Sequence, residues 1–454
     1  MELRPYQWEL IGKAREQLYL GSRNLLITAP TGCGKTAMAA EMIRLAKDKS
    51  FLCLFICHRR ELIHQASREF TKCDIAHEMI LPGIQPGNEN VHIISVQLLA
   101  RRLEYYKKFP RVFLVWDEGH HISSNSWARI KLAFPRSCHV GFTPVPERLD
   151  GKGLCHHFDT MIQGPSVRQL IELGYLSDYA VFAPAGPNLK GIRKIGGDYQ
   201  KEPLAMAMNT LTGDIVAEYK KHAMGKQALI FAVTIKHSLA IAKAFKEAGF
   251  TCNHIDGETP KGERDRLVED YANRKFPILT NCELFGEGFN VPGIECLIMA
   301  RPTASMALYR QQVGRALRPA VNKERAIILD MAGNVHRHGA PCDEITWSLE
   351  GKKNRLLKRN PYRMCKSCYF MQAISKPKCE ECGFEFPVNE RLLPIHKEGE
   401  LIEFNREELK KKRRLERLRA TTLSDLIALG KRRGYKNPYF WGLAVLRGRN
   451  KNKR

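Results

Sequence analysis

Residues 25–36, LLITAPTGCGKT, constrain the fold of this chain more than any other stretch. An apolar run, a turn of small residues and the helix-forming AMAAEMIRLAK follow one another, which predicts a buried strand that turns directly into a helix. Gly34, Lys35 and Thr36 fit the pattern Gly, four residues, Gly-Lys-Ser/Thr, with Ala29 in the place of the first glycine. Backbone N–H groups of such a turn bind phosphates. The stretch therefore predicts an α/β fold with a site for a nucleoside triphosphate.

The residues of this turn have distinct expected tasks. Lys35 is expected to reach the β and γ phosphates, and Thr36 to bind Mg²⁺ through its hydroxyl group. The other residues expected to hold the nucleotide are Thr31, Gly32, Cys33 and Gly34. A chance glycine turn is the alternative, and the strand–turn–helix order argues against it.

Two carboxylates and two histidines follow a second apolar run in VFLVWDEGHH, residues 112–121. Adjacent side chains of an extended chain point to opposite faces, so these four groups cannot all bind one transition-metal ion. The apolar run predicts a buried strand, and α/β sheets bind ligands at the C-terminal ends of such strands. We therefore expect Asp117 to complete the Mg²⁺ site and Glu118 to orient or deprotonate the attacking water.

The positive charge of the chain is concentrated near its C-terminus. The net charge is +25, and residues 351–454 hold 28 Lys and Arg against 11 Asp and Glu. Such a basic tail points to a polyanion, most simply nucleic acid. A solvated charged tail is the alternative that charge alone leaves open.

Other global features narrow the class of protein. The 454 residues suffice for two or three domains. No apolar run approaches the roughly 20 residues needed to span a bilayer, and the N-terminal MELRPYQWELIGKAREQL lacks the features of a signal peptide. We expect a cytoplasmic protein without a membrane partner, in which most cysteines are reduced and buried.

With these motifs in this order, roughly residues 1–350 resemble the superfamily 2 helicases of the DEAD/DEAH (DExH) type. LRPYQ at the N-terminus is similar to the family's adenine-recognising motif, which implies that Gln7 reads the adenine of ATP. DEGHH resembles motif II, in which His120 would couple the ATP site to the cleft between two domains. The resemblance assigns no role to His121.

Three more segments of the first half resemble family motifs. ICHRRELIHQ (56–65) and IISVQLLARR (93–102) are similar to segments that grip a nucleic-acid backbone, although each could be a simple exposed helix start. The coupling motif differs from the family's Thr-Ala-Thr-Pro, because this chain has Thr143-Pro144-Val145-Pro146. Pro144 removes a backbone donor and fixes φ. The departure concerns the coupling of hydrolysis to strand separation rather than hydrolysis itself.

The second half repeats the strand–helix pattern and resembles the family's second domain. A glycine-rich loop at 286–290 is similar to motif V, which implies that Gly288 contacts the nucleotide. SMALYRQQVGRALRP (305–319) matches Gln-x-x-Gly-Arg-x-x-Arg, with catalytic roles implied for Gln311, Arg315 and Arg318. We expect both arginines on one face of one helix, where they would stabilise transition-state charge at the γ-phosphate. A surface helix with ion pairs is the alternative.

Two Cys-x-x-Cys pairs predict a separate metal site, with Cys365, Cys368, Cys379 and Cys382 as ligands of one structural Zn²⁺. Disulfides and an iron–sulfur cluster are the alternatives. After these pairs, residues 404–420 form a basic helix-forming segment, and 431–454 mix aromatic with basic residues, as single-strand stacking platforms do. Tyr439, Phe440 and Trp441 are consecutive, so some of them are expected to pack inward.

The sequence thus predicts an α/β protein with two tandem RecA-like domains with parallel sheets (1–165 and 175–350), a zinc ribbon (360–388) and a basic helical C-terminal extension (389–454). The expected function is that of an ATP-dependent helicase or translocase that uses ATP, Mg²⁺ and Zn²⁺. DNA, single-stranded or forked, is favoured because the resemblance is to phage and prophage helicases of replication, recombination or repair. An RNA helicase and an ATP-gated clamp without strand separation are the alternatives. We expect a monomer, with replication or recombination proteins as further partners, in the bacterial host cytoplasm if the chain is phage-encoded.

Overall fold

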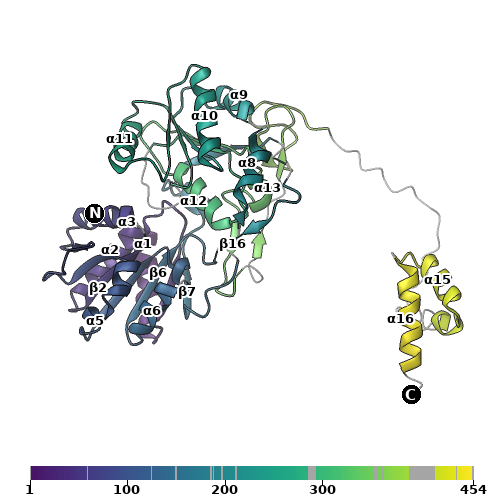
Figure 1. Cartoon of the computed structure of the whole chain (residues 1–454), viewed down its shortest axis with the longest axis horizontal. Helices are drawn as coiled ribbons and strands as arrows, with labels where there is room; N and C mark the ends of the chain where they lie inside the picture. The colour runs from purple at the N-terminus through teal and green to yellow at the C-terminus, as the bar shows by residue number, and fades with distance from the viewer. Residues whose placement is uncertain are drawn as a thin grey trace. The chain divides into compact units, whose positions relative to one another are not determined.

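The chain divides into two units, residues 1–387 and residues 388–454, which are described separately (Figure 1). The computed structural model describes residues 2–58, 60–123, 125–148, 151–184, 187, 189–195, 198–209, 212–284, 293–351, 356–358, 362–387, 415–435 and 437–451.

The first half of the larger unit is a 7-stranded parallel sheet in the order β3-β4-β2-β5-β6-β1-β7. Its strands are β1 Asn24–Thr28, β2 Leu52–Cys57, β3 Glu78–Ile80, β4 Val91–Ser95, β5 Val112–Asp117, β6 Cys138–Thr143 and β7 Thr160–Gln163. The helices are α1 Pro5–Tyr19, α2 Lys35–Lys47, α3 Arg60–Lys72, α4 Val96–Arg101, α5 Leu103–Tyr106 and α6 Asn125–Ala133, with the 3₁₀-helix η1 Gly119–Ser123 after β5.

Both faces of this sheet are buried, which explains why its strands are almost continuously apolar. Leu25 and Ile27 of β1 join one hydrophobic cluster with residues of α1, α2 and α3. Leu26, between them, joins a second cluster with residues of α4, α5 and α6. The predicted strands at 25–28 and 112–117 are therefore two-sided core strands.

The second half of this unit is a 6-stranded parallel sheet in the order β12-β13-β11-β14-β15-β8. Its strands are β8 Asp178–Phe182, β11 Ala228–Phe231, β12 Cys252–Ile255, β13 Ile278–Asn281, β14 Cys296–Met299 and β15 Arg325–Leu329. The helices are α7 Val167–Glu172, which precedes β8, then α8 Lys201–Asn209, α9 Thr212–His222, α10 Ile235–Glu247, α11 Lys261–Ala272, α12 Met306–Ala316 and α13 Asn334–His338. Short antiparallel pairs are β9 Lys194–Ile195 with β10 Asp198–Tyr199, and β16 Glu344–Thr346 with β17 Leu356–Lys358.

The four predicted metal ligands lie in a small ribbon, called here the cysteine ribbon (residues 362–387), which contains β18 Tyr362–Met364 and β19 Met371–Ala373. The cysteine ribbon packs on β8, the edge strand of the second sheet. The Ala183 N–H donates to the Tyr369 carbonyl at 3.0 Å, and the Phe182 and Phe370 ring centroids are 5.6 Å apart. Glu381 forms an ion pair with Arg325 at 2.9 Å. The ribbon is therefore attached to the second half of this unit.

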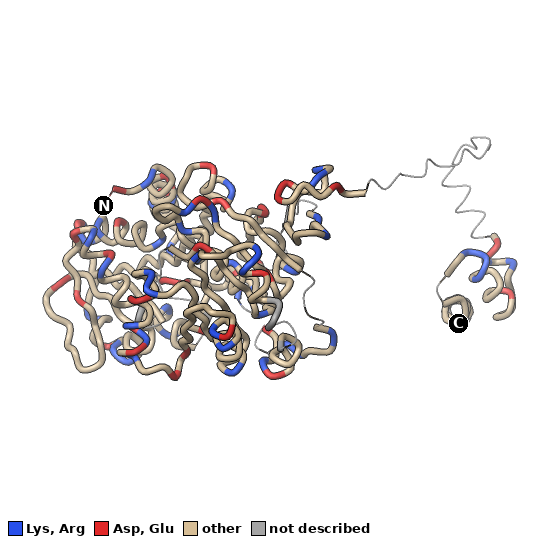
Figure 2. The backbone as a smooth tube through the Cα atoms, turned by 90° about the horizontal axis from the view of Figure 1, so that it is seen from above, with Lys and Arg blue, Asp and Glu red and all other residues tan. Residues whose placement is uncertain are grey.

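The smaller unit contains a helical hairpin of α15 Leu423–Arg432 and α16 Pro438–Lys451. Leu426 and Leu429 are buried against Trp441, whereas Tyr439 and Phe440 are exposed, so the three consecutive aromatic residues divide as expected. Lys and Arg outnumber Asp and Glu here (Figure 2). Most of the predicted basic segment 404–420 lies outside the described residues. Among the helices of the described ranges, none combines the length and apolar character that crossing a bilayer requires.

Candidate nucleotide-binding site

The turn between β1 and α2 has the backbone conformation of a phosphate-binding loop. Gly32 and Gly34 have φ of 91° and 80°, in the left-handed region that favours glycine. Helix α2 begins at Lys35, directly after this turn, so the backbone N–H groups at the start of the helix lie beside the turn. The Lys35 ammonium folds over the turn and donates to the carbonyls of Ala29 and Pro30, both at 3.3 Å. Thr36 follows on the first turn of α2. The local conformation thus suits a bound phosphate chain.

The N-terminal motif is anchored to this turn. Gln7 is buried and donates through Nε2 to the Cys33 carbonyl at 2.9 Å, while its Oε1 accepts from the Arg4 N–H at 2.8 Å. The Tyr6 hydroxyl donates to the same carbonyl at 2.6 Å. A side-chain amide can donate two hydrogen bonds and accept two. Gln7 can therefore donate one more hydrogen bond and accept one more, which is the pairing that adenine requires. A Cβ at Gly34 would overlap Gln7 Nε2, so glycine is needed there for this contact as well.

The two carboxylates of DEGHH stand at the same sheet edge as the phosphate turn. Strands β5, β6 and β1 are neighbours and run parallel, so Asp117, Thr143 and the turn after Thr28 all follow their C-terminal ends. Glu118 has φ of 53°, in the left-handed region, which turns the chain sharply into η1. Its Oε2 lies 3.2 Å from Nδ1 of His120.

His120 joins this carboxylate to the coupling segment. Its Nδ1 is 3.0 Å from the Thr143 hydroxyl. The hydroxyl donates to the Val145 carbonyl at 2.9 Å and accepts from the Val145 N–H at 3.2 Å. Nδ1 of His120 thus lies within 3.2 Å of both the Thr143 hydroxyl and Glu118 Oε2. Pro144 costs this turn no hydrogen bond, since the backbone donor belongs to Val145.

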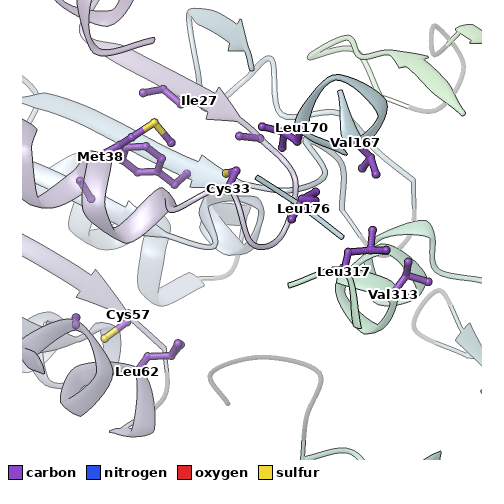
Figure 3. Packing of buried hydrophobic residues seen from close by; sticks show 14 of the residues in the cluster. Ile27, Cys33, Met38, Cys57, Leu62, Val167, Leu170, Leu176, Val313 and Leu317 are labelled. Atoms are coloured by element: carbon purple, nitrogen blue, oxygen red, sulfur yellow. The ribbon is translucent and has the colours of Figure 1, made fainter. Parts of the chain in front are cut away.

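The arginine-bearing helix abuts the phosphate turn. A Cβ added to Gly314 would lie 2.9 Å from Thr31 Cγ2, and one added to Gly32 would lie 3.6 Å from Arg318 Cγ. Next to this contact, Val313 and Leu317 belong to the same buried hydrophobic cluster as Cys33 and Leu176 (Figure 3). Arg315 is buried, and desolvation lowers the pKa of Arg318 from its ordinary value.

The expectation that both arginines share one helix is wrong. Helix α12 ends at Ala316, and Arg318 lies beyond its C-cap residue Leu317. Arg318 precedes Pro319, and the residue before a proline is disfavoured in the α region. The Lys323 ammonium donates to the Ala316 carbonyl and, at 2.9 Å, to the Arg318 carbonyl, so it satisfies two carbonyls at this helix end.

Two families match the parts of the chain that carry these motifs. The type III restriction enzyme, res subunit, family matches residues 1–148, and the helicase conserved C-terminal domain matches residues 209–320. A 51.5 kDa protein of a Lactococcus phage is 33% identical over 396 residues, which cover 85% of this chain and 84% of that protein. The chain belongs to the superfamily 2 helicases. The predicted family and the ATP-dependent helicase class are confirmed.

More distant relatives agree with this assignment. The helicase is 28% identical over 355 residues to IRC3 of Saccharomyces cerevisiae, a protein named as an ATP-dependent helicase. The aligned residues cover 73% of this chain and 51% of that protein. The helicase thus spans about half of the yeast protein. The ATP-dependent type ISP restriction-modification enzyme LlaBIII bound to DNA has a TM-score of 0.55 at 17% identity, over 72% of this chain and 27% of that one. That likeness concerns the fold, and the predicted pair of RecA-like α/β domains is confirmed.

The helicase also brings its four ribbon cysteines together. The Cys365 and Cys382 sulfur atoms are 3.7 Å apart, and those of Cys368 and Cys379 are 3.6 Å apart. Four thiolates at about 2.3 Å from one zinc ion would place their sulfur atoms about 3.8 Å apart, whereas a disulfide requires about 2.05 Å. The disulfide alternative is therefore excluded for this structure. A hydrogen bond from the Phe384 backbone lowers the pKa of Cys382 to about 7, whereas burial raises the pKa of Cys368 and Cys379.

Two residues that hold segments of the site in place were not accessible to sequence reasoning. Tyr6 adjoins the predicted Gln7, and its place next to Gln7 was the only indication that the sequence offered for Tyr6. Lys323 gave none, because its partners are backbone carbonyls at the end of a helix that was expected to continue. Gly288 and the loop around it lie outside the described residues.

Proposed function

We propose that this helicase is a DNA translocase that hydrolyses ATP at the sheet edge built by β1, β6 and β5. The observation that carries the proposal is the contact between the two halves of the larger unit: Gly314 and Arg318, from one half, lie against Thr31 and Gly32 of the phosphate turn. A nucleotide held by the turn would therefore be within reach of groups from both halves. Its hydrolysis could then change how the halves fit together.

The proposed roles follow the chemistry of each side chain. Lys35 binds the β and γ phosphates, together with the backbone of residues 31–34, and Gln7 reads the adenine. Thr36 and Asp117 hold Mg²⁺, which supplies positive charge to the phosphate oxygens when bound. Glu118 accepts the proton of the attacking water. Gln311, Arg315 and Arg318 face the transferred phosphate from the second half, and Gly288 would add a backbone contact.

His120 connects the proposed catalytic base to the coupling segment. Its Nδ1 lies 3.2 Å from Glu118 Oε2 and 3.0 Å from the Thr143 hydroxyl. A change in charge at Glu118 would therefore act on the contact that His120 makes with the coupling segment. The turn at Thr143 and Val145 is complete in spite of Pro144, which favours a motor over a passive clamp.

DNA is the proposed track. The solved relative LlaBIII is described as bound to DNA, and the C-terminal residues of this helicase are strongly basic. We further propose that Zn²⁺ is bound by the four ribbon cysteines, since their sulfur separations match a tetrahedral thiolate site. The proposed domains are 1–165, 175–350, 360–388 and 389–454. The helicase would act as a monomer in the cytoplasm, alongside replication or recombination proteins.

ATP hydrolysis with single-stranded DNA, duplex DNA and RNA in parallel tests the proposal. DNA should raise the rate more than RNA, and a forked DNA duplex should be unwound only when ATP is hydrolysed. Glu118→Gln is the matched control, because it retains the fold and the nucleotide-binding turn. Stimulation by RNA alone would favour an RNA helicase, and stimulation by DNA without unwinding or movement would favour the clamp.

A further inference from the structure

Three imidazole rings lie one against the next, tilted rather than parallel, at the C-terminal edge of the first sheet, and this row is called the stack below. The ring centroids of His120 and His121 are 4.2 Å apart, and those of His121 and His58 are 4.8 Å apart. His58 follows β2, whereas the other two rings lie in η1, directly after β5. Strands β2 and β5 are parallel neighbours, so their C-terminal ends lie side by side. His121 is the middle ring and contacts both others.

One end of the stack reaches the ATP site. His120 lies 3.2 Å from Glu118 Oε2 and 3.0 Å from the Thr143 hydroxyl, both through Nδ1. A rotation or displacement of the His120 ring would change both distances. The water-activating carboxylate is therefore sensitive to anything that moves this ring.

The other end of the stack reaches the segment 56–65. His58 itself belongs to that segment and lies two residues before Arg60, where α3 begins. The segment 56–65 resembles family segments that grip a nucleic-acid backbone, and this step rests on that resemblance and on the proposed function. Binding of a phosphate there would reposition the chain at His58.

The stack has room to move because it borders a cavity. His58, His120 and His121 line one side of a cavity of about 390 Å³, and Gln311 and Gln312 of α12 line another part of it. Rings that pack into a closed core resist displacement, whereas rings at a cavity wall can shift as a set. Contact between the rings means that a displaced His58 moves the ring next to it.

We propose that His121 is a positioning residue that links nucleic-acid binding at 56–65 to ATP hydrolysis at Glu118. It touches neither substrate in this scheme. It acts by holding His58 and His120 in contact, so that binding at one end favours the productive Glu118 arrangement at the other. A metal-ligand role has no support, because among the described residues the ribbon cysteines are the group whose ligand atoms come together.

Replacement of the middle ring tests the link. His121→Ala should leave ATP hydrolysis without nucleic acid near the unmodified rate and lower the stimulation by single-stranded DNA about two- to tenfold, the range expected for one lost ring contact. His121→Phe restores a ring of similar size and should restore most of the stimulation. Thermal unfolding of each variant monitors the fold, and rescue by Phe separates ring contact from simple damage.

A double-mutant cycle gives the sharper measurement. If the rings form one link, the His58→Ala, His121→Ala double variant should lose no more stimulation than the more affected single variant. Additive losses, or undiminished stimulation of His121→Ala, would overturn the proposal for His121 while leaving the DNA translocase intact. An unmodified helicase whose ATPase ignores every nucleic acid would overturn the proposed function and this link together.

Discussion

Gly314 of α12 packs directly on Thr31 of the phosphate turn. A Cβ at this position would lie 2.9 Å from Thr31 Cγ2 and closer still to Thr31 Cβ. Because Thr31 Cβ is attached to the backbone, it cannot swing aside as the end of a long side chain can. The absence of a side chain at Gly314 therefore sets how closely the arginine-bearing helix approaches the turn.

Gly314→Ala should slow ATP hydrolysis while leaving the stability of the fold nearly unchanged. Alanine favours a helix over glycine by roughly 0.5–1 kcal/mol, yet the added methyl group must push α12 away from Thr31. Displacement of catalytic groups by about 1 Å can cost on the order of 10²-fold in rate. We expect kcat for ATP to fall by that order while the unfolding temperature changes little. Gly12→Ala is the matched control, since Gly12 lies in α1 with nothing within 4 Å of an added Cβ; equal kcat values for both variants would contradict the prediction.

Lys35→Ala and Glu118→Gln should fail at different steps. Loss of the Lys35 ammonium removes the cation proposed for the phosphates, so both nucleotide affinity and hydrolysis should fall. Glu118→Gln removes only the base, so ATP should still bind while turnover drops by on the order of 10² to 10⁴. Binding of a fluorescent ATP analogue and single-turnover hydrolysis distinguish the two. Hydrolysis by Glu118→Gln at the unmodified rate would rule out the assigned role.

Metal analysis should find one zinc per chain, and Cys379→Ser should lose it. The Ala183 amide, which donates to Tyr369 of the cysteine ribbon, should then exchange its hydrogen faster. Cys155→Ser is the control, because Cys155 is half-buried and lies outside the four-cysteine cluster. Iron in place of zinc, or no metal, would contradict the assignment.

Removal of residues 388–454 should weaken nucleic-acid binding but leave basal ATP hydrolysis, because the proposed catalytic residues all precede the deletion. Each phosphate contact that is lost should reduce the slope of log affinity against log salt by about 0.7 to 0.9. Titrations at several salt concentrations measure this slope. An unchanged affinity and slope would identify the extension as a solvated appendage or a docking site for another protein.

Acid should destabilise the first half of the larger unit through His139. This buried ring accepts from Trp116 Nε1 at 3.3 Å and lies 3.0 Å from the Phe134 carbonyl, and burial lowers its pKa to about 4. In the unfolded chain the pKa is about 6.5, so the unfolded state binds a proton first as the pH falls. Stability is therefore complete above about pH 6.5 and decreases toward pH 4, by about 2 kcal/mol at pH 5.

Urea unfolding at pH 7 and pH 5 measures this effect. His139→Gln should lose part of the pH dependence, whereas His156→Gln should keep it, because His156 is exposed and stays hydrated in both states. A pH dependence that His139→Gln leaves intact would assign the acid sensitivity to other groups.

The sequence was most informative where function depends on consecutive residues. The turn at 31–36 and the strand ending at Asp117 could be predicted because their chemistry needs a fixed order of residues next to an apolar run. The two parallel sheets followed from the same alternation of strands and helices. The individual roles of these residues stay predictions that the variants above test.

Features that depend on distant segments were not predictable. The end of α12 at Ala316 could have been expected from Pro319, but its stabilisation by Lys323 depends on where the chain returns. The contact between His58 and His121 joins residues that follow two different strands, and neither residue type indicates the contact. The packing of the cysteine ribbon on β8 likewise required the sheet order.

That packing gives the proposed zinc site a consequence for solubility. Strand β8 ends the second sheet, and an unpaired strand edge is a template for pairing with another molecule. Tyr369 and Phe370 cover the end of β8 at Phe182 and Ala183. A ribbon too small to hold its shape without metal would leave this edge open. If the cysteines bind zinc as proposed, chelation should produce concentration-dependent self-association, so that zinc would protect the helicase against aggregation.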